Sequence, residues 1–144
     1  MLEFWKAMKK QRFEEEVKKI EHEISRSKRF NYSFGIFVVD ISNTAPKGIS
    51  ALMPGKTLSF HLMKKYIRGY DKLFGPFFRR YYIILPQSDR NGINAFKQRI
   101  YRLAKEYKWG DLSIGEALYD EDGESPQALL DAAISRLSSL NNPG

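Results

Sequence analysis

The stretch FGIFVVDI, at residues 34–41, constrains the fold of this chain more than any other segment. It is apolar and rich in β-branched residues, and its one charged residue, Asp40, comes near the end. A strand without polar alternate positions is covered on both faces in folded proteins. The segment therefore predicts a buried central strand, with the rest of the domain built around it.

The residues on either side alternate between helical and strand periodicity. A helix with a narrow apolar stripe is predicted over 3–29, and Ser125 followed by Pro126 is typical of a helix N-terminus. The predicted order is helix 3–29, strand 34–41, a short helix after the loop 43–55, a strand near 71–74, a turn at Gly75-Pro76, strand 80–85, helix 89–107, strand 111–119 and a last helix from 126. This order predicts one α+β domain, a mixed sheet with helices packed on it.

Composition limits the functional classes. The 144 residues suffice for one domain with a real core. Lys and Arg number 24 against 17 Asp and Glu, and the net charge of +7 fits either an anionic partner or a solvated basic surface. The absence of Cys removes disulfides, thiolate metal sites and Cys nucleophiles. No apolar run approaches the roughly 20 residues of a membrane span, so a cytoplasmic location is expected.

Common catalytic and nucleotide-binding motifs are missing. The sequence has no Gly-x-x-x-x-Gly-Lys-Ser/Thr loop, no Gly-x-Gly-x-x-Gly and no Gly-x-Ser-x-Gly. His22 and His61 lie far apart on predicted helices, and we interpret them as surface or boundary residues. The acidic loop 120–124 lacks EF-hand spacing and reads as a solvated turn. Neither a metal site nor a cofactor is predicted.

Three segments share their spacing with one known family. Residues 12–42, RFEEEVKKIEHEISRSKRFNYSFGIFVVDIS, join a charged helix to the apolar strand. Residues 68–86, RGYDKLFGPFFRRYYIILP, contain Arg-x-x-Asp, then five residues, then the segment 77–81 and a strand that ends in Leu-Pro. Residues 112–133, LSIGEALYDEDGESPQALLDAA, carry Ser-Ile-Gly in a late strand before the final helix. Together these segments resemble the GGDEF (diguanylate cyclase) domain of bacterial signalling proteins.

The resemblance implies a nucleotidyl-cyclase-like fold with a ferredoxin-like core sheet of about five strands flanked by helices. It assigns residues 1–30 to an N-terminal helix and residues 31–144 to the domain. The five-residue signature of the family falls on Phe77, Phe78, Arg79, Arg80 and Tyr81.

The signature positions predict a degenerate domain without catalytic activity. Active members bind GTP and make cyclic di-GMP, with signature glycines that admit phosphates and acids that help hold metal. Here Phe77 and Phe78 replace the glycines, while Arg79 and Arg80 replace acids with cations that cannot coordinate Mg²⁺. Asp40 retains one further acid of the family pattern. We therefore expect that this chain is not an enzyme.

A retained binding motif gives the main functional hypothesis. In the family, Arg-x-x-Asp ahead of the signature forms an inhibitory site for cyclic di-GMP, and Arg68 and Asp71 occupy those positions. By spacing, Arg99 matches a further arginine of that site. The resemblance implies a receptor that binds cyclic di-GMP through these three residues. A surface salt bridge between Arg68 and Asp71 is the competing interpretation.

Two other functions stay open. Phe77, Phe78, Arg79 and Arg80 could form a protein-contact surface, or one ring could fill the vacated nucleotide pocket while the arginines stay exposed. The alternative to a receptor is a ligand-free scaffold that forms a homodimer or binds a protein partner. Nucleic-acid binding is the least supported function, because the basic residues match no known nucleic-acid-recognition motif.

Overall fold

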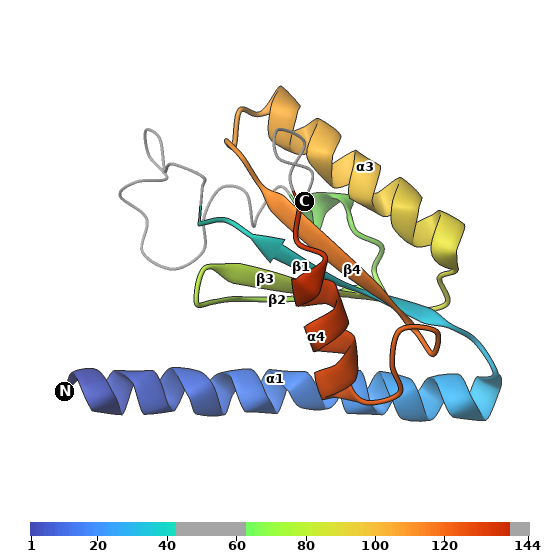
Figure 1. The fold of residues 1–144 in the computed structure, drawn as a ribbon, viewed down its shortest axis with the longest axis horizontal. Helices are drawn as coiled ribbons and strands as arrows, with labels where there is room; N and C mark the ends of the chain where they lie inside the picture. The colour runs from blue at the N-terminus through green and yellow to red at the C-terminus, as the bar shows by residue number, and fades with distance from the viewer. Residues whose placement is uncertain (43–62, 139–144) are drawn as a thin grey trace.

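The computed structural model describes residues 1–42 and 63–138 (Figure 1). A helical stretch at residues 63–66 precedes the second strand. The main elements in chain order are α1 (Leu2–Phe30), β1 (Phe34–Asp40), β2 (Lys72–Phe77), β3 (Arg80–Leu85), α3 (Arg90–Glu106), β4 (Ser113–Tyr119) and α4 (Pro126–Ser135). The predicted succession of helices and strands is confirmed for the described residues, whereas the predicted loop 43–55 and His61 lie outside them.

The strands form one antiparallel sheet in the order β2-β3-β1-β4. Strands β1 and β2 run in the same direction, but β3 lies between them, so every neighbouring pair is antiparallel. The predicted mixed sheet was wrong on this point, because the sequence does not show that the β2–β3 hairpin inserts its second strand beside β1. This order is that of the split βαβ, ferredoxin-like core. About five strands were expected, and the described residues contain four.

Helices cover both faces of the sheet, as the apolar run of β1 predicts. Helix α3 lies on one face, where Phe37 and Val39 point, and α1 and α4 lie on the other, where Ile36 and Val38 point (Figure 1). All four of these β1 side chains are buried. The central strand therefore contributes to two separate apolar clusters.

Local capping signals set the helix ends. Asp89 caps α3 by accepting a hydrogen bond from the Gly92 N–H at 2.7 Å, and Ser125 caps α4 by accepting from the Ala128 N–H at 3.1 Å. Helix α1 ends at Phe30, and its C-cap residue Asn31 has a left-handed φ of 53°. Among the described residues, no helix has the length and apolar character that crossing a membrane requires.

Candidate functional site

The Arg-x-x-Asp segment forms a tight turn that leads into β2. The Asp71 backbone N–H donates to the Arg68 carbonyl oxygen at 3.0 Å, and the Asp71 Oδ2 accepts from the Arg68 backbone N–H at 2.8 Å. Short acidic side chains that bond nearby backbone groups commonly close turns. The spacing of this motif thus has a local structural role.

Arg68 and Asp71 also form an ion pair within the turn. Arg68 Nε lies 3.0 Å from Asp71 Oδ1 and 3.1 Å from Oδ2, and Arg68 Nη2 lies 2.9 Å from Oδ1. The Asp71 side chain is 1% exposed, whereas that of Arg68 is 41% exposed. Hydrogen bonding to Asp71 raises the pKa of Arg68, although burial acts in the opposite direction. The carboxylate is engaged by its own chain, and the guanidinium is the group that faces outward.

Further contacts hold the Arg68 guanidinium in place. Its Nη2 donates to the Pro86 carbonyl oxygen at 3.2 Å and to Ser88 Oγ at 3.3 Å. Its Cζ lies 4.4 Å from the ring centroid of Tyr70, which is exposed. A planar cation fixed in this way is preorganised to pair with an anion or to stack on a flat base.

An open pocket of about 570 Å³ lies beside Arg68. Hydrogen bonds join the two loops that border it: the Ser88 N–H donates to the Ser33 carbonyl oxygen at 3.0 Å, and Ser33 Oγ donates to the Ser88 carbonyl oxygen at 2.9 Å. The volume is in the range of small-molecule sites. The lining is largely polar and consists of Asn31, Tyr32, Ser33, Arg68, Gln87, Ser88, Asp89 and Gly92.

Arg99 lies apart from this pocket. It is exposed on α3, ten residues beyond the Asp89 cap, which corresponds to about 15 Å along the helix. The structure thus brings Arg68 and Asp71 together but does not place Arg99 in the pocket lining.

The five signature positions form the tip of the β2–β3 hairpin. Phe77 ends β2 opposite Arg80, and the two turn residues, Phe78 and Arg79, have φ angles of 53° and 64°. The turn was predicted at Gly75-Pro76 but lies at 78–79. Gly75 and Pro76 instead sit inside β2, where the strand register shifts between Phe74 and Phe77. Two positive φ angles are the requirement of a type I′ hairpin turn, which normally selects Gly or Asn.

The Arg80 guanidinium pairs with Asp40 where the resemblance expects metal-binding acids. Strand register places the two residues opposite each other, and Arg80 Nε lies 2.9 Å from Asp40 Oδ2. The other Asp40 oxygen accepts from the Ser42 N–H at 2.8 Å. Burial alone would raise the pKa of Asp40, but hydrogen bonds from Ser42 and Arg80 outweigh it and lower that pKa. The Arg80 side chain therefore neutralises the Asp40 carboxylate.

The two signature rings lie in different environments. Phe77 is half-buried and packs on Phe13 of α1, with ring centroids 5.5 Å apart. Tyr82 contacts the same Phe13 ring at 5.1 Å. Phe78 projects from the turn and is exposed, as is Arg79. One ring is thus used to attach α1 to the hairpin, and the other remains on the surface.

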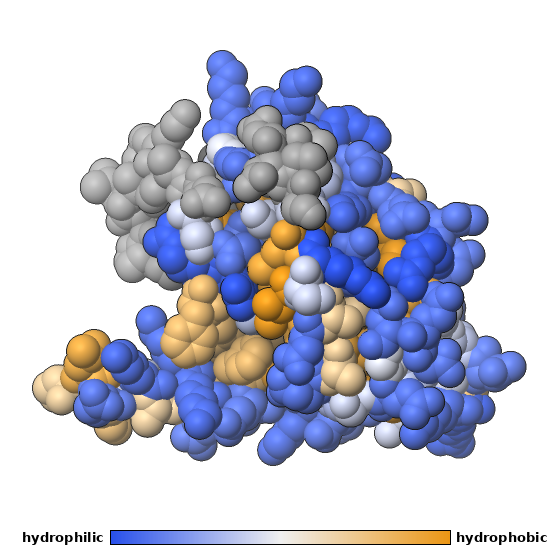
Figure 2. All heavy atoms as spheres, in the orientation of Figure 1, coloured by the Kyte–Doolittle hydropathy of each residue, from blue (hydrophilic) through white to orange (hydrophobic). Residues whose placement is uncertain are grey.

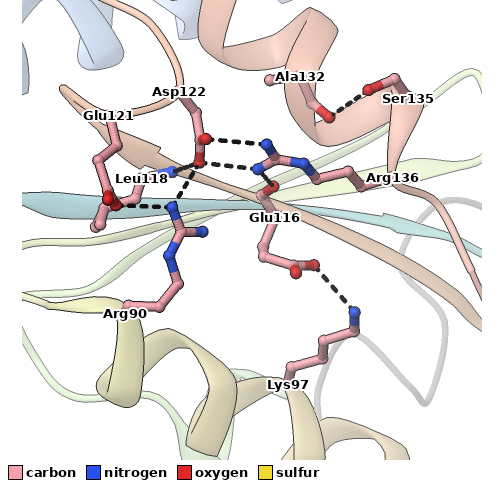
Figure 3. A network of polar contacts seen from close by, with 9 residues as sticks. All are labelled: Arg90, Lys97, Glu116, Leu118, Glu121, Asp122, Ala132, Ser135 and Arg136. Carbon is pink, nitrogen blue, oxygen red and sulfur yellow. Dashed lines mark hydrogen bonds and ion pairs between the residues drawn. The ribbon is translucent and has the colours of Figure 1, made fainter.

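An acidic residue that the sequence analysis treated as solvated is largely buried. The carboxylate of Asp122 accepts from Arg136 at 2.8 and 2.9 Å, from Arg90 Nη2 at 3.2 Å and from the Leu118 N–H at 2.8 Å (Figure 3). Hydrogen bonds from Arg136 lower the pKa of Asp122, although burial opposes them. No local signal marks this residue, because its arginine partners are 14 and 32 residues away. Among the described residues, no cluster of three or more His, Cys, Asp or Glu side chains could hold a metal ion.

Comparison with known proteins identifies the fold. No protein-family model and no curated protein sequence matches the chain. Among solved structures, a DGC protein from Thermotoga maritima matches with a TM-score of 0.68 and 15% identity, covering 87% of this chain and 93% of that one. The GGDEF domain of YfiN from Pseudomonas aeruginosa matches with a TM-score of 0.60 and 15% identity, covering 82% of this chain and 76% of that one. The chain has the fold of a GGDEF domain.

A third match is to a GGDEF domain studied with a ligand. It is a microbial GGDEF domain whose structure describes an interaction with cyclic di-GMP, with a TM-score of 0.60, 13% identity and coverage of 83% and 82%. At such identities the similarity establishes the GGDEF fold and not the activity of this chain.

Proposed function

We propose that this GGDEF-fold domain is a catalytically inactive receptor that binds cyclic di-GMP in the pocket beside Arg68. The observation that carries the proposal is the outward-facing Arg68 guanidinium, which is fixed by Asp71 and forms one wall of a polar pocket of about 570 Å³. A dinucleotide offers anionic phosphates and flat guanines, and both suit a planar, stacked arginine.

In this proposal Asp71 acts through Arg68. Its buried carboxylate orients the guanidinium and closes the turn, so Arg68 and the polar pocket wall contact the guanine, and Tyr70, which is outside the pocket lining, supports Arg68 by stacking on it. Arg99 lies outside the pocket lining. In this proposal it acts on the phosphates only through long-range electrostatic attraction.

The absence of catalysis rests on the Asp40–Arg80 pair. Phosphoryl transfer by two bound metals needs carboxylate oxygens on the metals, and the guanidinium of Arg80 occupies the carboxylate of Asp40. Incubation with GTP and Mg²⁺ should therefore give no cyclic di-GMP. Product formation at a rate proportional to protein concentration would contradict this part of the proposal.

Calorimetry tests the receptor directly. Cyclic di-GMP titrated into the full chain should give saturable heat, and GTP should give less. Arg68→Ala should weaken binding by about tenfold or more, because a charge-assisted contact contributes roughly 1.5–3 kcal/mol. Arg102→Ala is the matched control, since this arginine is exposed on α3 and does not line the pocket.

Arg68→Ala leaves the buried Asp71 carboxylate without its partner, so a loss of binding in this variant could also come from misfolding. A second variant therefore tests the same site without breaking the ion pair. Tyr70→Ala removes the stacking ring but leaves the ion pair intact. Weaker binding in this variant supports the receptor. Equal heats for the wild type, Tyr70→Ala and Arg68→Ala, with all three folded, would refute it.

A ligand-free docking scaffold is the second candidate, and the exposed ring of Phe78 next to Arg79 favours it. Exposed aromatic and arginine side chains are frequent anchors of protein interfaces. If the scaffold is the function, Phe78→Ser abolishes self-association or partner binding, and Arg68→Ala leaves both unchanged.

A further inference from the structure

The first two turns of α1 carry a separate apolar surface. Large apolar side chains are exposed here, and orange spheres gather on this end of α1, which projects past the β2–β3 hairpin at the lower left of Figures 1 and 2. Those that follow the i, i+3, i+4, i+7 pattern of one helix face are called the N-terminal stripe. The N-terminal stripe consists of Met1, Phe4, Trp5 and Met8.

This surface is not a continuation of the face that packs on the domain. The domain-facing side of α1 includes Phe13, Val17 and Ile20. At about 100° of rotation per residue, the N-terminal stripe is turned by roughly 130° from Phe13 around the helix axis. Its side chains therefore cannot join the apolar cluster beneath the sheet, and they face outward.

Basic side chains lie at the flank of the N-terminal stripe and on the opposite side of the helix. At about 100° per residue, Lys9 and Arg12 are within roughly 90° of the centre of the N-terminal stripe, whereas Lys6 and Lys10 are roughly 150° or more away. Residues 1–13 contain Lys6, Lys9, Lys10 and Arg12 but only one acid, Glu3. Within the described parts of the chain, none of these four cations forms an ion pair. Aromatic rings and methionines on one face, with unpaired cations at its flank and on the polar face, are the composition of helices that lie in the interface of a membrane.

We propose that the N-terminal stripe docks this domain onto an anionic lipid surface. Phe4, Trp5 and Met8 enter the boundary between headgroups and acyl chains, while Lys9 and Arg12 at the flank contact anionic headgroups. The helix lies on the bilayer and does not span it. This inference is independent of ligand binding at Arg68.

Size and charge favour a lipid surface over a second copy of the chain. The N-terminal stripe extends over only about 11 Å of helix, whereas a stable protein interface buries roughly 800 Å² on each partner. A second copy would also bring four further cations against the first four. A bilayer needs no shape match, and anionic headgroups turn the same charges into attraction.

Vesicle binding by the full chain tests the proposal. The protein should co-sediment with vesicles made of equal parts phosphatidylcholine and phosphatidylglycerol, and not with pure phosphatidylcholine. Trp5 reports insertion by a blue shift of its fluorescence, because the other tryptophan, Trp109, is already buried within the domain. Added salt should weaken the binding by screening the headgroup charges.

Matched variants distinguish binding through the N-terminal stripe from nonspecific adsorption to vesicles. Phe4→Ser with Trp5→Ser should reduce vesicle partitioning by about tenfold or more, since each ring loses its burial in the lipid. Phe30→Ser changes a ring of similar exposure at the other end of α1, 62% against 59% for Phe4, and should leave partitioning unchanged. Both variants change exposed side chains, and circular dichroism checks that the fold is kept.

Three results would overturn the proposal. The wild type could fail to bind anionic vesicles at low salt, or the double variant could bind as well as the wild type. The third is a protein that self-associates through the N-terminal stripe in analytical ultracentrifugation and does not bind vesicles, which would make a second copy its occupant.

Discussion

Replacing Asp122 by asparagine should destabilise the domain by about 2–3 kcal/mol, because its carboxylate ties three elements together. The side chain is 9% exposed and lies between the end of β4, the start of α3 and the end of α4 (Figure 3). It accepts hydrogen bonds from the Leu118 N–H, from Arg90 and from both terminal nitrogens of Arg136. Asparagine keeps the shape but turns an NH₂ group or a neutral oxygen toward two cations.

The magnitude follows from the exposure of the partners. Hydrogen bonds to a charged group contribute roughly 1.5–3 kcal/mol each, and breaking a fully buried pair costs about 3–5 kcal/mol. Arg90 and Arg136 are partly exposed and regain water when the pair is lost, which places the net cost toward the lower end. For a domain of this size, the melting temperature should fall by about 5–10 °C.

Thermal unfolding followed by circular dichroism measures the effect. Glu121→Gln is the matched control, because Glu121 is in the same loop and lies 2.8 Å from the same Arg90, but its side chain is 64% exposed. An exposed ion pair contributes less than about 1 kcal/mol, so the control should melt close to the wild type.

The pH dependence gives a second check. The pKa of Asp122 is lower in the folded state than the ordinary value of about 3.9, so its charged form stabilises the fold above that value. This contribution is lost as the pH falls from there through the folded-state pKa. The melting temperatures of the wild type and Asp122→Asn should therefore converge below about pH 4. Equal decreases in melting temperature for Asp122→Asn and Glu121→Gln would refute the argument. So would a difference in melting temperature between the wild type and Asp122→Asn that does not shrink in acid.

Two further predictions concern backbone geometry. Phe78→Gly should raise the stability by about 0.5–1 kcal/mol, because Phe78 is exposed and its φ of 53° is costly for any residue with a Cβ; denaturant unfolding measures this, and a loss of stability would contradict it. Gly115→Ala should destabilise by more than about 3 kcal/mol, because a Cβ there would lie 1.8 Å from the Ala133 carbonyl oxygen. A Gly115→Ala protein that melts like the wild type would show that α4 can move away from β4 without cost.

Much of the fold could be predicted because its signals are local. The buried strand at 34–40 follows from an uninterrupted apolar run, and the cap residues Asp89 and Ser125 mark helix starts through bonds to residues three positions away. The hairpin turn was misplaced because Gly and Pro are strong turn formers, whereas the turn itself holds Phe78 and Arg79, which the type I′ geometry disfavours.

The candidate site was predictable only in part. The Arg-x-x-Asp spacing pointed to Arg68 and Asp71, and the two do lie together. Whether the Asp71 carboxylate faces a ligand or Arg68 depends on how deeply the turn is buried. The spacing of the two residues in the sequence does not predict this burial. The pocket beside Arg68 is built from three separated segments, around residues 31–33, 68 and 87–92, so its lining could not be read from any one of them.

The sequence by itself determined the succession of elements, the boundaries of most helices and strands, and the aromatic and cationic character of residues 77–80. These properties depend on backbone hydrogen bonding and side-chain chemistry within a few residues. Only the tertiary structure decided the partners of the charged groups. Asp40 meets Arg80 because strand register brings together residues 40 positions apart, and Asp122 meets its arginines across three elements. The free energy of an ion pair depends on distance and burial, and folding sets both.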